Sequence, residues 1–194
     1  MINFKIKLEE IVNTPGDINE HLYYLMDLAK TVKHVTEFGV RFGCSSLAFL
    51  NTDVILRSYD ILHQDITQSY FEQAKKLGKD VSYEVKNVLK IEIENTDLLF
   101  IDTFHNYDQV LQELRLHAQN VHKYIVFHDT VLFGRESQPH DDSVFTTPPT
   151  ELNNGTTKYL GILDGIEQYM KEDLSWKIKD IRLNNNGLIT IEKI

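Results

Sequence analysis

The sequence predicts an α/β fold: a doubly wound, mostly parallel sheet of seven strands that ends in an antiparallel C-terminal hairpin. Three observations lead to this prediction. Short apolar, β-branched runs alternate with segments of helical periodicity along most of the chain. Residues 97–102 are apolar almost throughout, as in a strand covered on both faces. An Asn-Gly pair at 186–187 separates the last two runs, and this dipeptide is a strong hairpin signal.

The first half of the chain contains three strands and the helices between them. Residues 1–33 form an N-terminal helical segment, because apolar residues in 21–33 have near-helical spacing. Residues 34–40 are β-branched and closed by a glycine, which predicts a strand that runs into a tight turn. The elements that follow are a helix at 45–50, a strand at 53–59, a helix at 69–77 and a strand at 81–85.

The second half contains the most apolar strands, at 97–102 and 124–128, with an amphipathic helix at 106–121 between them. Residues 134–158 then hold three of the four prolines and few large apolar residues. Loops of this length are usually functional, so this one is a candidate lid. The last predicted elements are a helix at 159–170 and two strands at 176–183 and 188–194.

Length and composition indicate a single domain over residues 1–194. The formal net charge is −9, so neither a nucleic acid nor an anionic membrane surface is expected as a partner. The single cysteine, Cys44, excludes an internal disulfide and fits a reducing compartment. The chain has no run of apolar residues long enough for a signal peptide or a membrane span, and we therefore expect a cytoplasmic protein.

The turn after the first predicted strand, residues 37–45, has the sequence EFGVRFGCS. A dinucleotide fingerprint requires a glycine where Arg41 stands, and a P-loop requires Lys-Ser/Thr after its second glycine. Gly39 and Gly43 therefore allow a close backbone approach without a diphosphate cradle, and Glu37 can accept a hydrogen bond from an ammonium group. A tight turn that binds no ligand is the alternative.

Asp60 ends the second predicted strand, 23 residues after Glu37, where an acid can accept both hydroxyls of a ribose. An acid and a glycine turn at these places together indicate a nucleoside without a pyrophosphate. The positively charged sulfonium of S-adenosylmethionine (SAM) suits such an acidic pocket.

Three segments together resemble the class I SAM-dependent methyltransferases: VTEFGVRFGCS at 35–45, DLLFIDTFHNY at 97–107 and FHDT at 127–130. The similarity is nearest to small stand-alone bacterial and phage-type members related to the cation-dependent O-methyltransferases, and it covers most of the chain. It implies a Rossmann-like methyltransferase fold and SAM as the cofactor. The cofactor-binding residues that it implies are Glu37, Gly39, Gly43, Ser45, Asp60, Asn87 and Asp102.

Acids and histidines follow the two most apolar strands: Asp102 with His105, and His128 with Asp129. Together they could hold a divalent metal ion, or form a base and its orienting acid. A structural role is the alternative, with Asp102 as a helix cap and His128 in a polar pocket. The sequence does not choose among the three.

Residues 128–134, HDTVLFG, resemble the Asp-Asn-x-Leu-Trp-x-Gly segment of cation-dependent catechol-type and caffeoyl-coenzyme A-type O-methyltransferases. The resemblance implies a metal site at Asp102, His128 and Asp129, and it places His105 where that group has a catalytic lysine. An imidazole ligand shifts the preference from Mg²⁺ towards ions such as Mn²⁺ or Fe²⁺. The candidate bases are His105, and His128 oriented by Asp129.

The leading hypothesis is thus a SAM-dependent methyltransferase that acts on a hydroxyl of a small molecule or sugar. The alternative is a non-catalytic nucleoside- or ligand-binding module on the same fold, which the combination of Glu37, Gly39 and Asp60 disfavours. The sequence predicts neither the methyl acceptor nor the oligomeric state.

Overall fold

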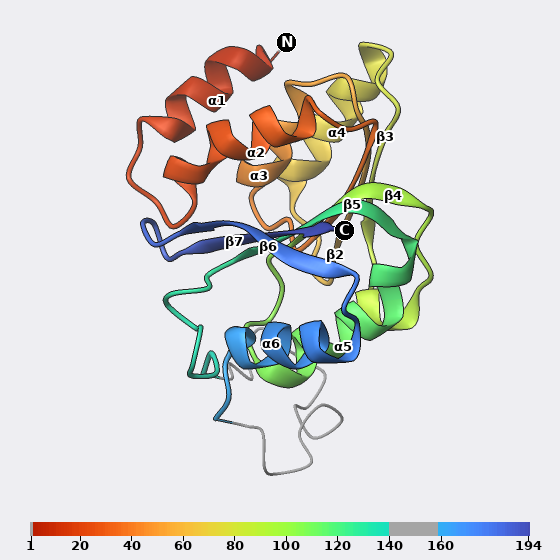
Figure 1. Cartoon of the computed structure of the whole chain (residues 1–194). Coiled ribbons are helices and arrows are strands. Elements are labelled where there is room, and N and C mark those ends of the chain that lie inside the picture. Colours follow the sequence, from red (N-terminus) through yellow and green to blue (C-terminus); the bar gives the residue numbers. More distant parts are fainter. Residues whose placement is uncertain (1, 140–158) are drawn as a thin grey trace.

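Figure 1 shows the protein as a computed structural model, which describes residues 2–139 and 159–194. The described residues contain one mixed seven-stranded sheet with the strand order β3-β2-β1-β4-β5-β7-β6. Its members are β1 (His34–Phe38), β2 (Ile55–Asp60), β3 (Val81–Val85), β4 (Thr96–Ile101), β5 (Val121–His128), β6 (Trp176–Arg182) and β7 (Leu188–Lys193). The first five strands are parallel, and β7 pairs antiparallel with both β5 and β6. The predicted fold class is confirmed.

Helices cover both faces of the sheet (Figure 1). Those of the described residues are α1 (Phe4–Val12), α2 (Leu22–Ala29), α3 (Cys44–Leu50), α4 (Asp65–Lys76), α5 (Tyr107–His117) and α6 (Ile162–Glu172), with short 3₁₀ helices η1 (Asn19–His21), η2 (Val88–Lys90) and η3 (Ala118–Asn120). Helices α1 to α4 enclose one apolar core, which includes Phe49 and Phe100. Helices α5 and α6 enclose the other, which includes Phe38 and Phe127.

Element boundaries differ from the sequence prediction by three or four residues at α4, which begins at Asp65 and not at residue 69, at α6, which begins at Ile162 and not at residue 159, and around α5 and β5. The predicted helix at 106–121 ends at His117, and β5 begins at Val121, three residues before the predicted strand. The first residues of β5 are hard to predict because His122 and Lys123 are exposed polar residues. The β4–β5 register also shifts between Thr96 and Leu98. The predicted lid at 134–158 lies mostly outside the described residues, of which 134–139 belong to it.

The strand order reverses between β1 and β4, so the carboxyl ends of β1, β4 and β5 border the crevice in which ligands of such sheets bind. The register of β4 and β5 pairs Ile101 with Phe127. The residues that follow each of these, Asp102 and His128, therefore come side by side.

The hairpin turn between β6 and β7 lies against the N-terminal segment. The backbone N–H of Glu20 donates to Oδ1 of Asn185 (3.0 Å), and Nδ2 of Asn185 donates to the carbonyl oxygen of Gly16 (2.6 Å). The segment that follows α1 and the β6–β7 turn thus meet beside the carboxyl end of β5. None of the helices in residues 2–139 and 159–194 has the length and apolar character needed to cross a membrane.

Candidate active site

The glycine turn after β1 packs directly against the carboxyl end of β4. Gly39 has φ +80°, and a Cβ at this position would lie 2.0 Å from the carbonyl oxygen of Asp102. Only glycine fits so close an approach. The Asp60 carboxylate accepts hydrogen bonds through Oδ2 from the backbone N–H groups of Val40 (2.8 Å) and Arg41 (2.7 Å). The acid predicted to bind a ribose therefore also shapes the turn.

Glu37 is fully buried beneath this turn. Its Oε1 accepts a hydrogen bond from the Ser45 hydroxyl (2.6 Å), and its Oε2 accepts from Ser46 (2.7 Å) and Ser58 (2.5 Å). Burial raises the pKa of Glu37 to about 7, although the three hydroxyls oppose the rise. The structure thus joins two predicted cofactor-binding residues, Glu37 and Ser45, to each other.

Two other predicted cofactor-binding residues begin helical segments. Gly43, with φ +76°, precedes α3, and a Cβ there would lie 3.1 Å from the ring of Tyr70. Asn87 caps η2 by accepting a hydrogen bond from the backbone N–H of Leu89 (2.9 Å). Because Asn87 follows β3, two strands away from β1, it lies at the periphery of the crevice.

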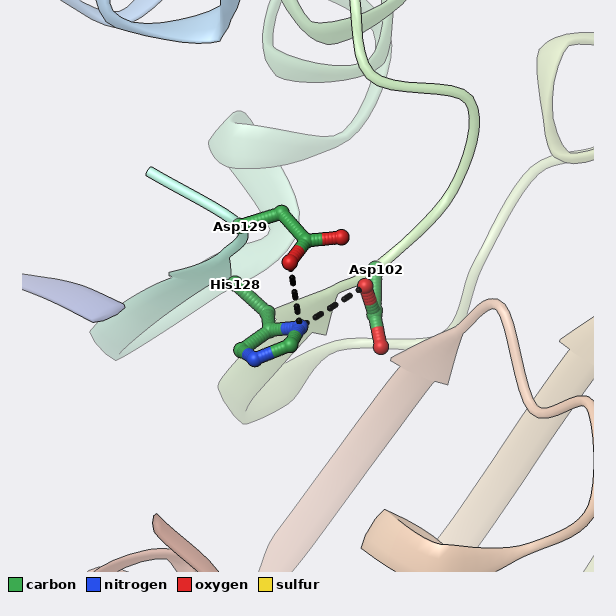
Figure 2. A group of neighbouring side chains, drawn as sticks. All are labelled: Asp102, His128 and Asp129. Carbon is green, nitrogen blue, oxygen red and sulfur yellow. Dashed lines mark hydrogen bonds and ion pairs between the residues drawn. The ribbon is translucent and has the colours of Figure 1, made fainter. Parts of the chain in front are cut away.

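Asp102, His105, His128 and Asp129 form one cluster at the ends of β4 and β5. Nδ1 of His128 lies 3.2 Å from Oδ1 of Asp102 and 3.6 Å from Oδ1 of Asp129. Figure 2 shows this nitrogen between the two carboxylates. Nε2 of His105 lies 3.1 Å from Oδ1 of Asp102 and 3.2 Å from Oδ2 of Asp129. Two imidazoles thus face the same two carboxylates.

The backbone fixes which nitrogen of His128 faces the acids. Nε2 of His128 lies 3.0 Å from the carbonyl oxygen of Asp17 and 3.3 Å from that of Asn185. Carbonyl oxygens only accept hydrogen bonds, so Nε2 carries a hydrogen. Between Nδ1 and the carboxylates there must then be a second positive centre, either a proton or a metal ion.

The residues of the cluster strongly perturb one another's protonation. Burial alone would lower the pKa of His128, but the charges of Asp102 and Asp129 and the hydrogen bonds to the ring together outweigh it and raise the pKa to about 9. The pKa of His105 is raised as well, because its interactions with Asp102, Asp129 and Gln138 together outweigh burial. For Asp102, burial opposes ionisation, yet the two histidines hold its pKa well below the usual range. Burial raises the pKa of Asp129.

Several solved structures with methyltransferase descriptions are similar to the chain, and three of them follow. A provisionally named caffeoyl-CoA O-methyltransferase from Staphylococcus aureus has a TM-score of 0.66 and 14% identity, over 100% of this chain and 93% of that one. An O-methyltransferase from Bacillus cereus, solved with S-adenosylhomocysteine (SAH), has a TM-score of 0.64 and 14% identity, over 100% and 92%. The O-methyltransferase TomG from Streptomyces achromogenes, solved with SAM, has a TM-score of 0.59 and 12% identity, over 100% and 90%.

The chain has the Rossmann-like methyltransferase fold. No protein-family model matches the sequence, and no curated protein is similar to it. The similarity is therefore one of structure, and it confirms the fold that the sequence resemblance implied.

In this methyltransferase fold the cluster has the donor set of a cation site. One ligand atom each from Asp102, His128 and Asp129 lies within 4.8 Å of the others. Oδ1 of Asp129 is buried and has no hydrogen-bond partner among the described residues. A metal-bound histidine usually donates its other N–H to a carbonyl or carboxylate, as Nε2 of His128 does to Asp17. The residues therefore fit a divalent ion.

Some residues that build the candidate site could not be identified from the sequence. Asp17 and Asn185 contribute backbone carbonyls, which no side-chain pattern reveals. His21 is fully buried, with its ring centroid 5.8 Å from that of His128. Gln138 bonds to His105 from the loop after β5, in a segment predicted only as a lid.

Proposed function

We propose that the protein is a SAM-dependent methyltransferase that methylates a hydroxyl group of a small molecule, with a sugar among the candidate acceptors. The observation that carries this proposal is the cluster of two carboxylates and two imidazoles, which lies beside the glycine turn of a methyltransferase fold. The net charge of −9 disfavours a nucleic acid as the acceptor, and we expect the reaction to occur in the cytoplasm.

The crevice beyond β1, β2 and β4 is the proposed SAM site. Asp60 is partly exposed, and its Oδ1 accepts only one hydrogen bond among the described residues, from the backbone N–H of Leu62 (2.9 Å). Its remaining lone pairs suit the hydroxyls of a ribose. Glu37 and Ser45 support the turn from below, and Gly39 brings the turn against Asp102. Bound SAM supplies the methyl group. The acceptor oxygen forms the new bond to carbon as the carbon–sulfur bond breaks, and the electron pair of the broken bond stays on sulfur.

His105 is the proposed general base. Its Nδ1 is held by Gln138, so its Nε2 is the nitrogen that can accept the proton of the acceptor hydroxyl. Without another cation, Asp102 and Asp129 face this ring and favour its protonated form. A cation held by both carboxylates would remove that influence, and the ring would then be free to accept a proton.

Asp102, His128 and Asp129 are the proposed metal ligands, and the imidazole among them favours Mn²⁺ or Fe²⁺ over Mg²⁺. A divalent ion bound there would lower the pKa of an acceptor hydroxyl beside it. The residues of the chain then position that hydroxyl and take its proton, and positioning accounts for much of the rate of a displacement at carbon.

The test is an assay for SAH formation with SAM, Mn²⁺ and a panel of catechols and methyl glycosides. We expect SAH to form with at least one acceptor, and to be lost both on chelation and in His105→Asn. SAM binding without turnover on any acceptor would instead favour the non-catalytic ligand-binding alternative.

A further inference from the structure

We propose that Gln138 is a positioning residue for His105: it holds the ring hydrogen on Nδ1, so that Nε2 faces Asp102 and Asp129 with its lone pair. This inference rests on the proposed role of His105 as the base. The side-chain oxygen of Gln138 lies 2.8 Å from Nδ1 of His105. It also accepts a hydrogen bond from the backbone N–H of His105 (3.2 Å).

The bond from the backbone N–H of His105 identifies which atom of the Gln138 amide faces it. A backbone N–H can only donate, so the Gln138 atom that it meets is the amide oxygen and not the nitrogen. The same oxygen must then accept from Nδ1, and Nδ1 of His105 carries a hydrogen. The lone pair of a neutral His105 is thereby confined to Nε2, the nitrogen next to the two carboxylates.

The orientation of the ring is restrained from its face as well. The ring of Phe133 stacks on that of His105, with centroids 5.2 Å apart and an angle of 16° between the planes. A rotation of the imidazole by half a turn would keep this stacking but place ring carbons where Nδ1 and Nε2 lie, so both nitrogens would lose their partners. In the observed orientation the amide oxygen of Gln138 holds the ring hydrogen on Nδ1, while Asp102 and Asp129 face Nε2.

A purely structural role for Gln138 is separable from this one. The backbone N–H of Gln138 donates to the carbonyl oxygen of His105 (2.8 Å), and this bond holds the loop whatever side chain follows. The side-chain amide is thus not required to attach the loop.

The experiment compares Gln138→Leu, which removes the acceptor, with Gln138→Glu, which retains an oxygen at the same reach. Gln119→Leu is the matched control, because Gln119 is exposed and its side chain bonds only to the carbonyl of Leu116 among the described residues. The readout is the ring N–H signals in ¹⁵N-histidine-labelled protein, without metal or SAM. The His105 signal is assigned by its loss in His105→Asn.

We expect a slowly exchanging Nδ1–H signal of His105 in the wild type, in Gln138→Glu and in Gln119→Leu, and its loss in Gln138→Leu. With an acceptor that the wild type methylates, kcat of Gln138→Leu should fall about 10- to 100-fold while KM for SAM stays unchanged. Rescue of kcat by Gln138→Glu completes the expected pattern. If Gln138→Leu does not fold, Gln138→Asn, whose amide is one methylene too short, should show the same losses.

Retention of the Nδ1–H signal and of kcat in Gln138→Leu or Gln138→Asn would overturn the inference. A protein that does not bind SAM at all would refute the proposed function instead, and the ring N–H measurement would still report on the hydrogen bond.

Discussion

Nδ1 of His128 lies 3.2 Å from Oδ1 of Asp102, while Nε2 of the same ring lies 3.0 Å from the carbonyl oxygen of Asp17. The carbonyl requires a hydrogen on Nε2, and the carboxylate requires a positive centre at Nδ1. A proton and a divalent ion can both meet the second requirement. The identity of that centre decides whether the cluster is an ion-pair network or a metal site.

We predict that Mn²⁺ binds the wild-type protein at one site and that Asp129→Asn weakens this binding by at least about tenfold. The reason is that Asp129 provides a buried oxygen without a hydrogen-bond partner among the described residues. The measurement is a calorimetric titration with Mn²⁺ alone. Asp53→Asn, a change at a fully exposed carboxylate, is the control and should bind as the wild type does. Equal Mn²⁺ affinity in Asp129→Asn and the wild type would exclude this metal site and leave a proton at Nδ1.

Gly39→Ala should destabilise the fold by more than about 2 kcal/mol, because a Cβ would overlap the Asp102 carbonyl at 2.0 Å and the backbone has φ +80°. Gly78→Ala is a matched control: its φ is +82°, but a Cβ there meets no atom within 4 Å among the described residues. It should cost only the backbone strain, about 1 kcal/mol. Urea denaturation measures both variants, and equal losses would show that the contact with Asp102 contributes nothing.

Much of the fold and of the candidate site is predictable from the sequence, but the partner of Gly39 is not. The sheet was predictable because apolar strands such as 97–102 and 124–128 differ sharply in composition from the helices. The four residues of the cluster were predictable because they directly follow those strands. The close backbone approach at Gly39 was predicted as well, but its partner was not: the structure shows the carbonyl of Asp102, directly after β4. Gln138 acts through a contact between loops, which strand and helix patterns do not encode.

Glu113 predicts a dependence of stability on pH. Burial raises its pKa from 4.5 to about 7, and its Oε1 accepts hydrogen bonds from Thr103 (2.8 Å) and Gln109 (2.6 Å). Between these two pKa values the unfolded chain loses the proton and the folded protein keeps it, so stability falls as pH rises from 4.5 to about 7 and then levels off. A difference of 7 − 4.5 = 2.5 units corresponds to at most about 3 kcal/mol.

Glu113→Gln cannot ionise and preserves an oxygen for both donors. We therefore expect its free energy of unfolding to fall less between pH 5 and pH 8 than that of the wild type, with part of the decline remaining because Glu37 shifts in the same direction. Chemical denaturation at the two pH values measures this. Parallel declines in Glu113→Gln and the wild type would show that Glu113 is ionised in the folded protein.

Asp60→Ala should weaken SAM binding about 10- to 100-fold, since hydrogen bonds to a charged group contribute about 1.5–3 kcal/mol. Asp60 also holds the backbone of Val40 and Arg41, so the loss combines direct contacts with a looser turn. Thr67→Val separates the two effects, because the Thr67 hydroxyl braces the same turn through the carbonyl of Arg41 (2.6 Å) and lies on α4. Calorimetry should show a smaller loss of SAM affinity in Thr67→Val than in Asp60→Ala. Equal losses would show that Asp60 acts through the turn alone and does not bind the ribose.

The most direct test of the central claim is a calorimetric titration of the wild-type protein with SAM, followed by displacement with SAH. The methyltransferase fold, the glycine turn against Asp102 and the free lone pairs of Asp60 predict one site that both ligands share, with SAH competing for all of the bound SAM. Absence of binding by either ligand to the folded protein, with and without Mn²⁺, would contradict the account.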